Sequence, residues 1–540
     1  MLFTSFLCTF GLLLFQDTAA PPRTPAKTQQ PLVKVANLPG TWGESVRYRV
    51  SMDTKESQWH VWMGVQLTKP EKFEVWIPRW TPGGYHLADF AQYVDELVAQ
   101  DDAGNILKVE ETEDPKHWVI DPGKSTKIFI YYIANHSSPN GFAMDALEME
   151  ANRIKEKHAF INSTSLFAFV PGMLDRPTEV MLDLPKDWKS ACALPKNKDG
   201  VYLAPNYYRL EDSPFLMSPS LEVITYKVDN IPHEVACVGR SGDELKELAE
   251  KCEKITIAGK RIMGSLPYNR YVFLLGFLEE SGGGGLEHAD STLILLNSSM
   301  IGDDVVIHVL AHEFFHLWNA ERIRVNSIHK PDYTKALNTG TIWMNEGATE
   351  YMSFPLLHLS GLMTEKDVYK ELSKKNADIH TQKKISAKKS IVDFSRKWSS
   401  SKLGGLSGMM EIQFGVYERG AVTSFALDLL LRAQTKGEKG LTDVFRYIMI
   451  HFADKDKGYG EDELVEIIKK STGVDVTDFY NKYVAGTELP DLDPLLAPLG
   501  LTMVKSKKGR PAAGGFNDLE NVTDDQKALR AKFLNAGAAK

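Results

Sequence analysis

The chain of 540 residues contains only four cysteines, too few for the disulfide framework that holds many small secreted domains together. It also has no excess of basic residues: 63 Lys and Arg stand against 71 Asp and Glu, and the net charge is −8. Because proteins that bind nucleic acid usually carry a basic surplus, we expect no nucleic-acid partner. The hydrophobic content of 43% suffices for a large core, and the length indicates several domains.

Long hydrophobic runs are also absent, apart from one at the N-terminus. Residues 2–15 are mostly apolar, but a bilayer span takes about 20 such residues. The run fits a signal peptide over residues 1–20, with Thr18, Ala19 and Ala20 as the cleavage region, and so indicates an exported (periplasmic or secreted) protein. No Lys or Arg precedes the run, so an N-terminal membrane anchor is the alternative. Elsewhere we expect no stable membrane span.

Removal of the signal peptide would leave three cysteines, Cys192, Cys237 and Cys252. They can form at most one intrachain disulfide, which would leave one thiol over. Cysteine is among the residue types that are most often buried, so three buried free thiols are the favoured interpretation. A single disulfide among the three is the alternative.

The N-terminal half has the pattern of a β domain. Residues 21–38 are rich in Pro, Thr, Lys and Gln and indicate a linker. Over residues 39–225, short alternating segments separated by turn residues predict a β-sandwich-like domain. The segment Trp80-Thr-Pro-Gly-Gly-Tyr85 is either a structural turn, which we favour, or a binding loop. Clear strands are expected at 48–52, 61–65, 73–77 and 127–133.

After the β domain the hydrophobic spacing becomes mainly that of helices, with strands expected at 271–277 and 292–296. This part divides into a mixed domain over 226–400 and a helical domain over 401–501. Residues 502–540 are rich in Lys, Gly and Ala and are expected to form a poorly ordered tail. The fold class is therefore multidomain α+β. Six lysines are interpreted as a solvated surface: Lys374, Lys375, Lys383, Lys384, Lys388 and Lys389.

The strongest chemical signal is the segment His312-Glu-Phe-Phe-His316, on a helix expected to start near Asp303. Histidines four residues apart lie on one helical face, so both imidazoles can reach one metal ion. Glu313 is placed to accept a proton from a water at that metal. His308 lies about 12 Å along the axis from His316, too far to share the ion, and is interpreted as a core or supporting residue. The motif alone also arises by chance.

A third ligand comes from Trp343-Met-Asn-Glu-Gly-Ala348, where Glu346 follows His316 by thirty residues. Two His and one Glu leave a fourth position open for water, as a catalytic zinc requires. No cysteine lies nearby to form a closed structural site. Glu350 lies one turn further along the same helix face. It either accepts the second ring N–H of a ligand histidine, first of all His312, or is an exposed helix glutamate.

Together with other segments, these motifs resemble the glycyl aminopeptidase family of gluzincin zinc metallopeptidases, relatives of aminopeptidase N. The resemblance implies a thermolysin-like catalytic domain over 226–400. It also implies one Zn²⁺ per chain, held by His312, His316 and Glu346, and a peptide substrate with a free N-terminus. The similarity spans about residues 38–501 and is carried by six segments: 80–85, 312–324, 343–349, 417–421, 483–490 and 495–501.

The resemblance also assigns substrate-binding roles. Gly282-Gly-Gly-Gly-Leu-Glu-His288 resembles the segment that makes aminopeptidase N-type enzymes exopeptidases. Glu287 would bind the free α-ammonium, and Gly284 and Gly285 would let the substrate backbone approach closely. Tyr417 matches the tyrosine that donates a hydrogen bond to the tetrahedral oxyanion in relatives. The family preference implies a small first residue, Gly or Ala.

The sequence therefore predicts a zinc aminopeptidase, with Glu313 and Tyr417 as catalytic residues. A gluzincin endopeptidase or a peptidase of broad specificity is the alternative among enzymes. A different class is a non-catalytic protein whose β domain binds peptides or glycans. The presence of both catalytic residues disfavours that class. The sequence assigns no oligomeric state.

Overall fold

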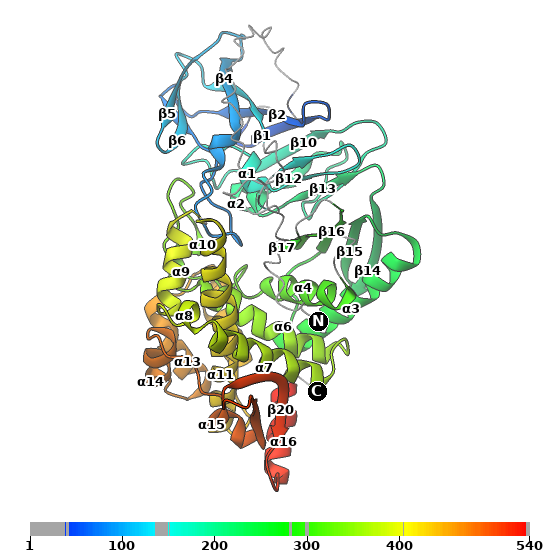
Figure 1. The fold of residues 1–540 in the computed structure, drawn as a ribbon. Helices are drawn as coiled ribbons and strands as arrows, with labels where there is room; N and C mark the ends of the chain where they lie inside the picture. The colour runs from blue at the N-terminus through cyan, green and yellow to red at the C-terminus, as the bar shows by residue number, and fades with distance from the viewer. Residues whose placement is uncertain are drawn as a thin grey trace, which may run out of the picture.

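The computed structural model describes residues 38, 43–135, 150, 152–279, 283–297, 302–402 and 404–535. They form a β-rich N-terminal domain, a region where a five-stranded sheet packs with helices, and a helical C-terminal region (Figure 1). The expected multidomain α+β fold class is confirmed. The expected signal peptide (1–20), and the expected linker (21–38) except Leu38, lie outside the described residues. Within the described ranges, no helix is both long enough and apolar enough to span a bilayer.

Three sheets build the N-terminal domain, with strand orders β12-β10-β1-β2-β7-β4, β11-β13-β9-β8 and β3-β6-β5. In β2 (Gln58–Gln66) the side chains of Trp59, Val61 and Met63 are buried and alternate with partly exposed ones, the pattern of a strand with one face on a core. The other strands are β1 (Val46–Asp53), β3 (Phe73–Val75), β4 (Val94–Asp101), β5 (Lys108–Glu113), β6 (Lys116–Asp121), β7 (Lys127–Ala134), β8 (Arg153–Ile154), β9 (Ala159–Ile161), β10 (Thr178–Asp183), β11 (Lys189–Ala191), β12 (Tyr202–Ala204) and β13 (Phe215–Ser218).

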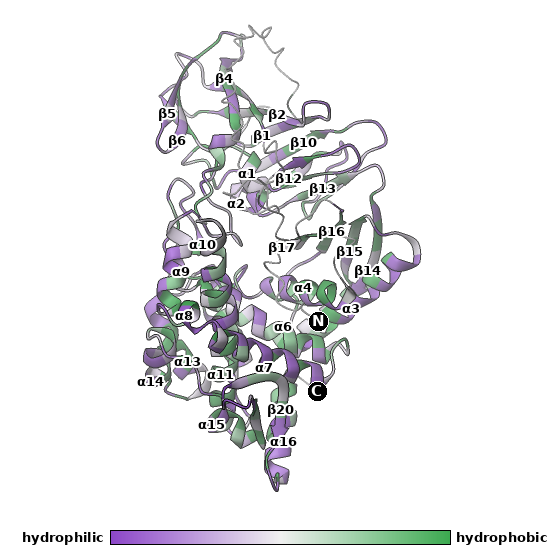
Figure 2. Cartoon of the chain, viewed as in Figure 1, coloured by the Kyte–Doolittle hydropathy of each residue, from purple (hydrophilic) through white to green (hydrophobic). Residues whose placement is uncertain are grey.

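The second region contains a five-stranded sheet of order β14-β15-β16-β18-β17. Its central strands run parallel, and both outer strands pair antiparallel to their neighbours. Every residue of β16 is buried, as expected for an uninterrupted apolar run, and the strand is green in Figure 2. Among the described strands β17 pairs with β18 alone, so β17 offers a free edge. The bounds are β14 (Glu222–Val228), β15 (Ile231–Val238), β16 (Tyr271–Phe277), β17 (Gly284–Glu287) and β18 (Ser291–Leu296).

Helices cover this sheet and continue into the C-terminal region (Figure 1). Two of them, α6 and α11, are each preceded directly by a π-helical turn, η3 (Trp343–Gly347) and η4 (Gln413–Tyr417). Such turns are rare and are often found at functional sites. The main helices are α3 (Gly242–Met263), α4 (Asp303–His316), α6 (Ala348–Leu359), α7 (Glu365–Thr381), α9 (Ile391–Ser400), α10 (Gly405–Ile412), α11 (Glu418–Gln434), α12 (Leu441–His451) and α13 (Leu464–Thr472). Shorter helices are α1 (Ser163–Leu166) and α2 (Tyr207–Glu211).

The turn η3 lies against the first turn of α11 through a pair of glycines, Gly347 and Gly420. A Cβ on Gly347 would lie 2.5 Å from Cα of Gly420, and one on Gly420 would lie 2.9 Å from Cα of Gly347. Contacts this short with backbone atoms are not tolerated, so only glycine permits this approach. Glu346 directly precedes Gly347, and Tyr417 lies three residues before Gly420. The contact therefore places these two residues on facing helical segments.

Arg419 fixes the same helix to the C-terminal region. Its side chain is fully buried, and burial lowers the pKa of the guanidinium to about 10. Nη1 and Nη2 donate hydrogen bonds to backbone carbonyls at distances of 2.6–3.3 Å. These carbonyls belong to Ser386, Lys389, Tyr483, Gly486 and Glu488. Arg419 thereby connects two distant motifs of the sequence, the segments 417–421 and 483–490.

Residues 502–535, the described part of the expected poorly ordered tail (502–540), have regular structure. Rings of this segment pack on α11, with Phe516 and Phe533 at centroid distances of 5.9 and 5.7 Å from Phe425. These anchoring aromatic residues are few and far apart in a Lys- and Gly-rich segment, so composition gave no sign of them. The segment forms β19 (Leu501–Lys505), β20 (Pro511–Asp518) and α16 (Asp524–Leu534).

The three cysteines are buried and free. Burial raises the pKa of the Cys192 and Cys237 thiols to about 12, so both stay protonated at neutral pH. Cys252 is likewise fully buried, on α3. All three therefore act as small apolar side chains, the interpretation that the sequence favoured.

Replacing Gly347 with Ala should push the two helices apart at their crossing. We expect a loss of about 1–3 kcal/mol in the free energy of unfolding, and a lower metal content because the neighbouring residue is Glu346. Calorimetry and metal analysis measure both. Gly302→Ala is the control, since a Cβ there meets no atom within 4 Å. Unchanged unfolding and metal content in the Gly347→Ala protein would show that the crossing does not hold the site together.

Candidate active site

The three residues expected as metal ligands are brought together. His312 and His316 lie one turn apart on α4, and their Nε2 atoms are 3.0 Å from each other. Oε2 of Glu346, on η3, lies 3.5 Å from Nε2 of His312 and 3.4 Å from Nε2 of His316. All three side chains are buried. One point is thus surrounded by two ring nitrogens and a carboxylate.

The proton positions on the two rings show what this point can hold. Nδ1 of His312 lies 2.9 Å from Oε2 of Glu350, and Nδ1 of His316 lies 2.9 Å from the carbonyl oxygen of Asn319. Both partners accept, so each Nδ1 carries a proton and each Nε2 faces the carboxylate of Glu346. Two ring nitrogens and a carboxylate oxygen 3.0–3.5 Å apart can share one cation, either a proton or a metal ion. Oε1 of Glu346 is also buried without a hydrogen-bond partner among the described residues. The donor set fits a divalent metal ion.

Of the two interpretations offered for Glu350, its contact with His312 agrees with the supporting role, which stays a prediction. Glu350 is 6% exposed, not an exposed helix glutamate. Besides His312, Glu350 also contacts His308, whose Nε2 lies 3.1 Å from its Oε1, so the additional histidine of α4 is a partner of this carboxylate. A carboxylate behind a ligand histidine fixes the tautomer and the ring orientation.

Asn319 is a supporting residue that the sequence analysis did not single out. Its carbonyl receives the N–H of His316, and its Nδ2 donates to the carbonyls of Met344 and Asn345 at 2.7 and 3.1 Å. It thereby joins the end of the helix that bears the histidines to the turn that bears Glu346. Its place three residues after the second histidine, within the matched segment 312–324, is the signal that could have identified it.

Glu313 points into the same buried space, beside the edge strand. Burial raises the pKa of its carboxyl to about 8, while His312 and His316 lower it in part. A Cβ on Gly285 would lie 2.3 Å from Oε1 of Glu313, so the strand backbone passes directly over this carboxyl. The glycine is required for that contact. A group that can hold or release a proton near neutral pH is thus placed at the strand edge.

Glu287 stands at the other end of β17. It is 3% exposed, and its Oε1 lies 4.0 Å from Nδ1 of His316 and accepts a hydrogen bond of 3.1 Å from the hydroxyl of Tyr85. With Glu313 and Glu346 it makes a third buried carboxylate in one place. Burial alone would lower the pKa of His316, but Glu287 and Glu346 raise it to about 9. The site therefore favours positive charge.

The loop Trp80–Tyr85, left open as a turn or a binding loop, reaches this site from the N-terminal domain (Figure 1). A Cβ on Gly83 would lie 2.6 Å from Oε2 of Glu287, and Tyr85 has a positive φ of 59°. Nδ2 of Asn345 donates to the Tyr85 hydroxyl at 3.4 Å. Tyr85 thus joins Glu287 to the turn that carries Glu346. Nothing in the local sequence shows a contact between residues 202 positions apart.

The N-terminal domain also holds the turn that follows Glu287. Oδ1 of Asp212, directly after α2, lies 3.1 Å from Nδ1 of His288, and its carboxylate accepts the N–H of Ala289. Arg209 of the same helix forms an ion pair with Asp290. Three consecutive residues after Glu287 are therefore fixed by one short helix of the β-rich domain. The site is built by both domains.

Tyr417 closes the site from η4, opposite α4. Its ring centroid lies 6.2 Å from that of His312 and 5.7 Å from that of Trp398. Burial, followed by the charges of Glu346 and Glu287, raises the pKa of the phenol well above its ordinary value. The hydroxyl therefore keeps its proton and can act as a hydrogen-bond donor.

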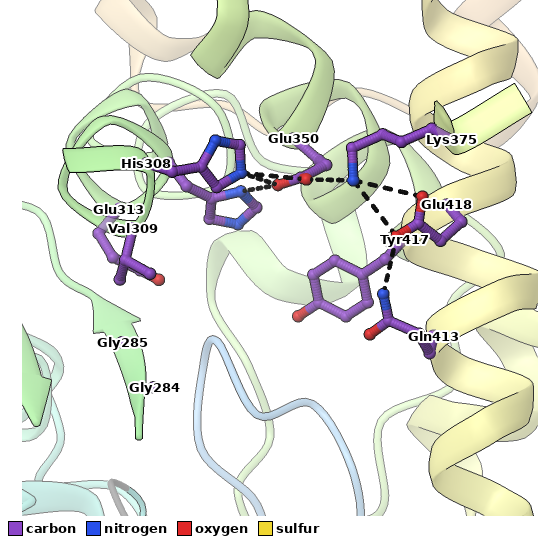
Figure 3. A pocket seen from close by; sticks show the side chains of 11 residues that line it. Gly284, Gly285, His308, Val309, Glu313, Glu350, Lys375, Gln413, Tyr417 and Glu418 are labelled. Atoms are coloured by element: carbon purple, nitrogen blue, oxygen red, sulfur yellow. Dashed lines mark hydrogen bonds and ion pairs between the residues drawn. The ribbon is translucent and has the colours of Figure 1, made fainter. Parts of the chain in front are cut away.

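A cavity of about 20 Å³ opens between these groups (Figure 3). It runs from Gly285 and Glu313 past His312 and Tyr417 to Lys375, which Figure 3 shows between two carboxylates. Space of this size holds a water molecule. The residues assigned to the site from the sequence thus lie on the helix α4, on the strand β17 beside it, on the turns η3 and η4, and, for Glu350, on α6.

Comparisons with known proteins agree with this arrangement. Two models of one family match the chain: the peptidase M61 N-terminal domain over residues 47–219, and M61 glycyl aminopeptidase over residues 305–423. Together they match more than half of the 540 residues. A search of curated proteins finds no match.

Solved structures share the fold. An aminopeptidase N family protein from Idiomarina loihiensis is 25% identical, with a TM-score of 0.75 over 85% of this chain and 79% of that one. Legionella pneumophila aminopeptidase A, in complex with aspartic acid, is 14% identical, with a TM-score of 0.50 over 82% of this chain and 49% of that one. The second likeness concerns the fold alone.

Proposed function

Because the chain belongs to the M61 glycyl aminopeptidase family and is a peptidase, we propose that it is a zinc-dependent aminopeptidase that removes small N-terminal residues from peptides. The observation that carries this proposal is the buried carboxylate of Glu287 beside the metal-binding group of His312, His316 and Glu346. A buried negative charge at that place pairs with the ammonium of a free N-terminus. An internal segment of peptide would leave it unpaired.

We assign Zn²⁺ to the group of His312, His316 and Glu346, since two imidazoles and one carboxylate are a typical donor set of catalytic zinc. When bound, Zn²⁺ supplies Lewis-acid chemistry: it polarises a carbonyl and lowers the pKa of water to about 7. Glu350 and the carbonyl of Asn319 keep both Nε2 atoms turned toward the ion. The two supporting contacts thus prepare the site before the metal arrives.

Glu313 accepts the proton of the attacking water and then delivers it to the leaving amine. Its carboxyl is buried and faces the edge strand, so it exchanges protons with few competing waters. Tyr417 donates a hydrogen bond to the oxygen that becomes negative as the carbonyl is attacked, because its phenol stays protonated.

The substrate adds to the free edge of β17. Its ammonium pairs with Glu287 at one end, and its backbone runs along Gly285 and Gly284, whose lack of side chains lets it approach. Two aromatic contacts support a small first residue. The ring of Trp398 lies 5.7 Å from the ring of Tyr85, whose hydroxyl bonds to Glu287, and 5.7 Å from that of Tyr417.

The remaining assignments concern the whole chain. We propose the expected signal peptide over residues 1–20 and hence export. We also propose a catalytic domain that ends near residue 400 and a helical domain after it. β14 crosses the expected boundary at residue 225 and pairs with β15, so the catalytic domain begins with that strand.

Two substitutions separate chemistry from metal binding. Glu313→Gln should keep the metal and the fold while turnover falls by about 10²–10⁴, the usual contribution of a positioned base. Tyr417→Phe should lose about 10²–10³ in turnover with unchanged metal content. Steady-state kinetics and metal analysis on the same preparations measure this. Near-normal turnover of the Tyr417→Phe protein would make that tyrosine a packing residue.

The role of Glu287 predicts the choice of substrate. Acetylating the N-terminus of a good peptide should remove nearly all cleavage, because a neutral amide cannot pair with the carboxylate. The loss of one partner of a buried charge pair costs about 2–5 kcal/mol, roughly 30-fold to several thousand-fold in kcat/KM. Glu287→Ala should lose much of this discrimination and keep its metal. A peptide series beginning with Gly, Ala, Leu and Phe measures the size of the first pocket.

The matched control is Tyr85→Phe, which keeps the carboxylate but removes its hydrogen bond. It should retain discrimination between free and acetylated peptides. If the native protein cuts acetylated peptides internally as fast as free ones, it is an endopeptidase and the aminopeptidase proposal fails.

A further inference from the structure

Lys375 is buried beneath the active site. It was expected on a solvated surface, but the residue is only 6% exposed, on α7. Its Nζ lies 2.6 Å from Oε1 of Glu350 and 3.2 and 3.3 Å from the two oxygens of Glu418 (Figure 3). The ammonium therefore bridges two carboxylates from two different helices, α6 and α11.

The helix period explains the burial. Val368, Leu372 and Ile379 form the buried apolar face of α7, and Lys375 follows Leu372 by three residues and precedes Ile379 by four. The side chain thus points inward with the core residues. Although burial by itself would favour the neutral amine, the charges of Glu350 and Glu418 raise the pKa of Lys375 above its ordinary value. The group stays an ammonium ion.

Each bridged carboxylate serves a different part of the site. Glu350 accepts the N–H of His312, a metal ligand, and also contacts His308. Glu418 directly follows Tyr417 and accepts a hydrogen bond of 3.0 Å from Nε2 of Gln413, the first residue of the π-helical turn. One ammonium therefore connects the orientation of a ligand ring with the turn that presents the phenol.

We propose that Lys375 is a positioning residue of the active site, which holds the His312 imidazole through Glu350 and the Tyr417 turn through Glu418. The inference deepens the proposed function and rests on it for the role of Tyr417. Without the ammonium, two carboxylates would face each other in the protein interior, and one would take up a proton or turn away. Either change weakens the hold on a ring or on a turn, although Lys375 touches neither the metal ligands nor the substrate.

Lys375→Met tests this proposal. Titration of the metal-free protein with Zn²⁺ should show binding weaker by about 10- to 100-fold, as for other residues behind metal ligands. In the metal-loaded protein kcat should fall while KM stays near its original value, since the ammonium does not contact the substrate. With Co²⁺ in place of zinc, the visible absorption spectrum should change because the His312 ring is no longer fixed. Lys375→Arg should restore part of both losses.

Lys374→Met is the matched control. Lys374 directly precedes Lys375 on the same helix, and it forms a partly exposed ion pair of 2.7 Å with Asp378. Such surface pairs contribute little, so Zn²⁺ affinity and kcat should stay unchanged. If Lys375→Met binds Zn²⁺ and turns over like the native protein, the proposal is wrong.

If the Lys375→Met protein does not fold, a double variant still tests the proposal. Lys375→Met with Glu418→Gln removes one charge of each sign and leaves no second carboxylate against Glu350. It should unfold at nearly the native temperature when metal-free, and still bind Zn²⁺ several-fold more weakly with a lower kcat. Native affinity and kcat in this protein would mean that Lys375 only neutralises a buried charge. The Zn²⁺ titration needs no substrate, so it remains informative even if the native protein releases no N-terminal residue.

Discussion

Buried negative charge is the constraint on which the rest of the structure depends. The carboxyl groups of Glu287, Glu313 and Glu346 are buried close together, and the Nε2 atoms of His312 and His316 face the carboxylate of Glu346. Charges of one sign are costly to bury unless opposite charge joins them. In the proposed function two cations supply that charge: a metal ion among the candidate ligands, and an ammonium beside Glu287. The family's activity matches that electrostatic demand.

The surrounding fold supplies the rigidity that such a site needs. Contacts between the elements that carry the candidate ligands run through Glu350, Asn319 and Lys375, none of which belongs to the candidate metal-binding group. The close pair of Gly347 and Gly420 lets the turn that carries Glu346 meet the start of α11, which directly follows Tyr417. The N-terminal domain participates through its loop at Tyr85 and its helix α2, so the two domains form a single active site.

The sequence predicted correctly those elements that leave a local signal, either a hydrophobic periodicity or a motif spacing. The strand at 271–277 and the helix from Asp303 lie where the sequence placed them, since apolar runs and i, i+4 histidines are local signals. The predictions that were wrong concern residues whose environment is formed by segments distant in the sequence. Lys375 was grouped with surface lysines by composition, although its spacing from Leu372 and Ile379 places it on the buried face. The packing of Phe516 on Phe425, which orders the tail, also has no local sign.

A metal titration tests the central claim most directly. The native protein is stripped with a chelator and Zn²⁺ is returned in steps, while bound metal and the release of glycine from a glycyl peptide are followed together. The account predicts that both rise in proportion and stop at one Zn²⁺ per chain. Full release of glycine by protein that holds no metal would contradict it.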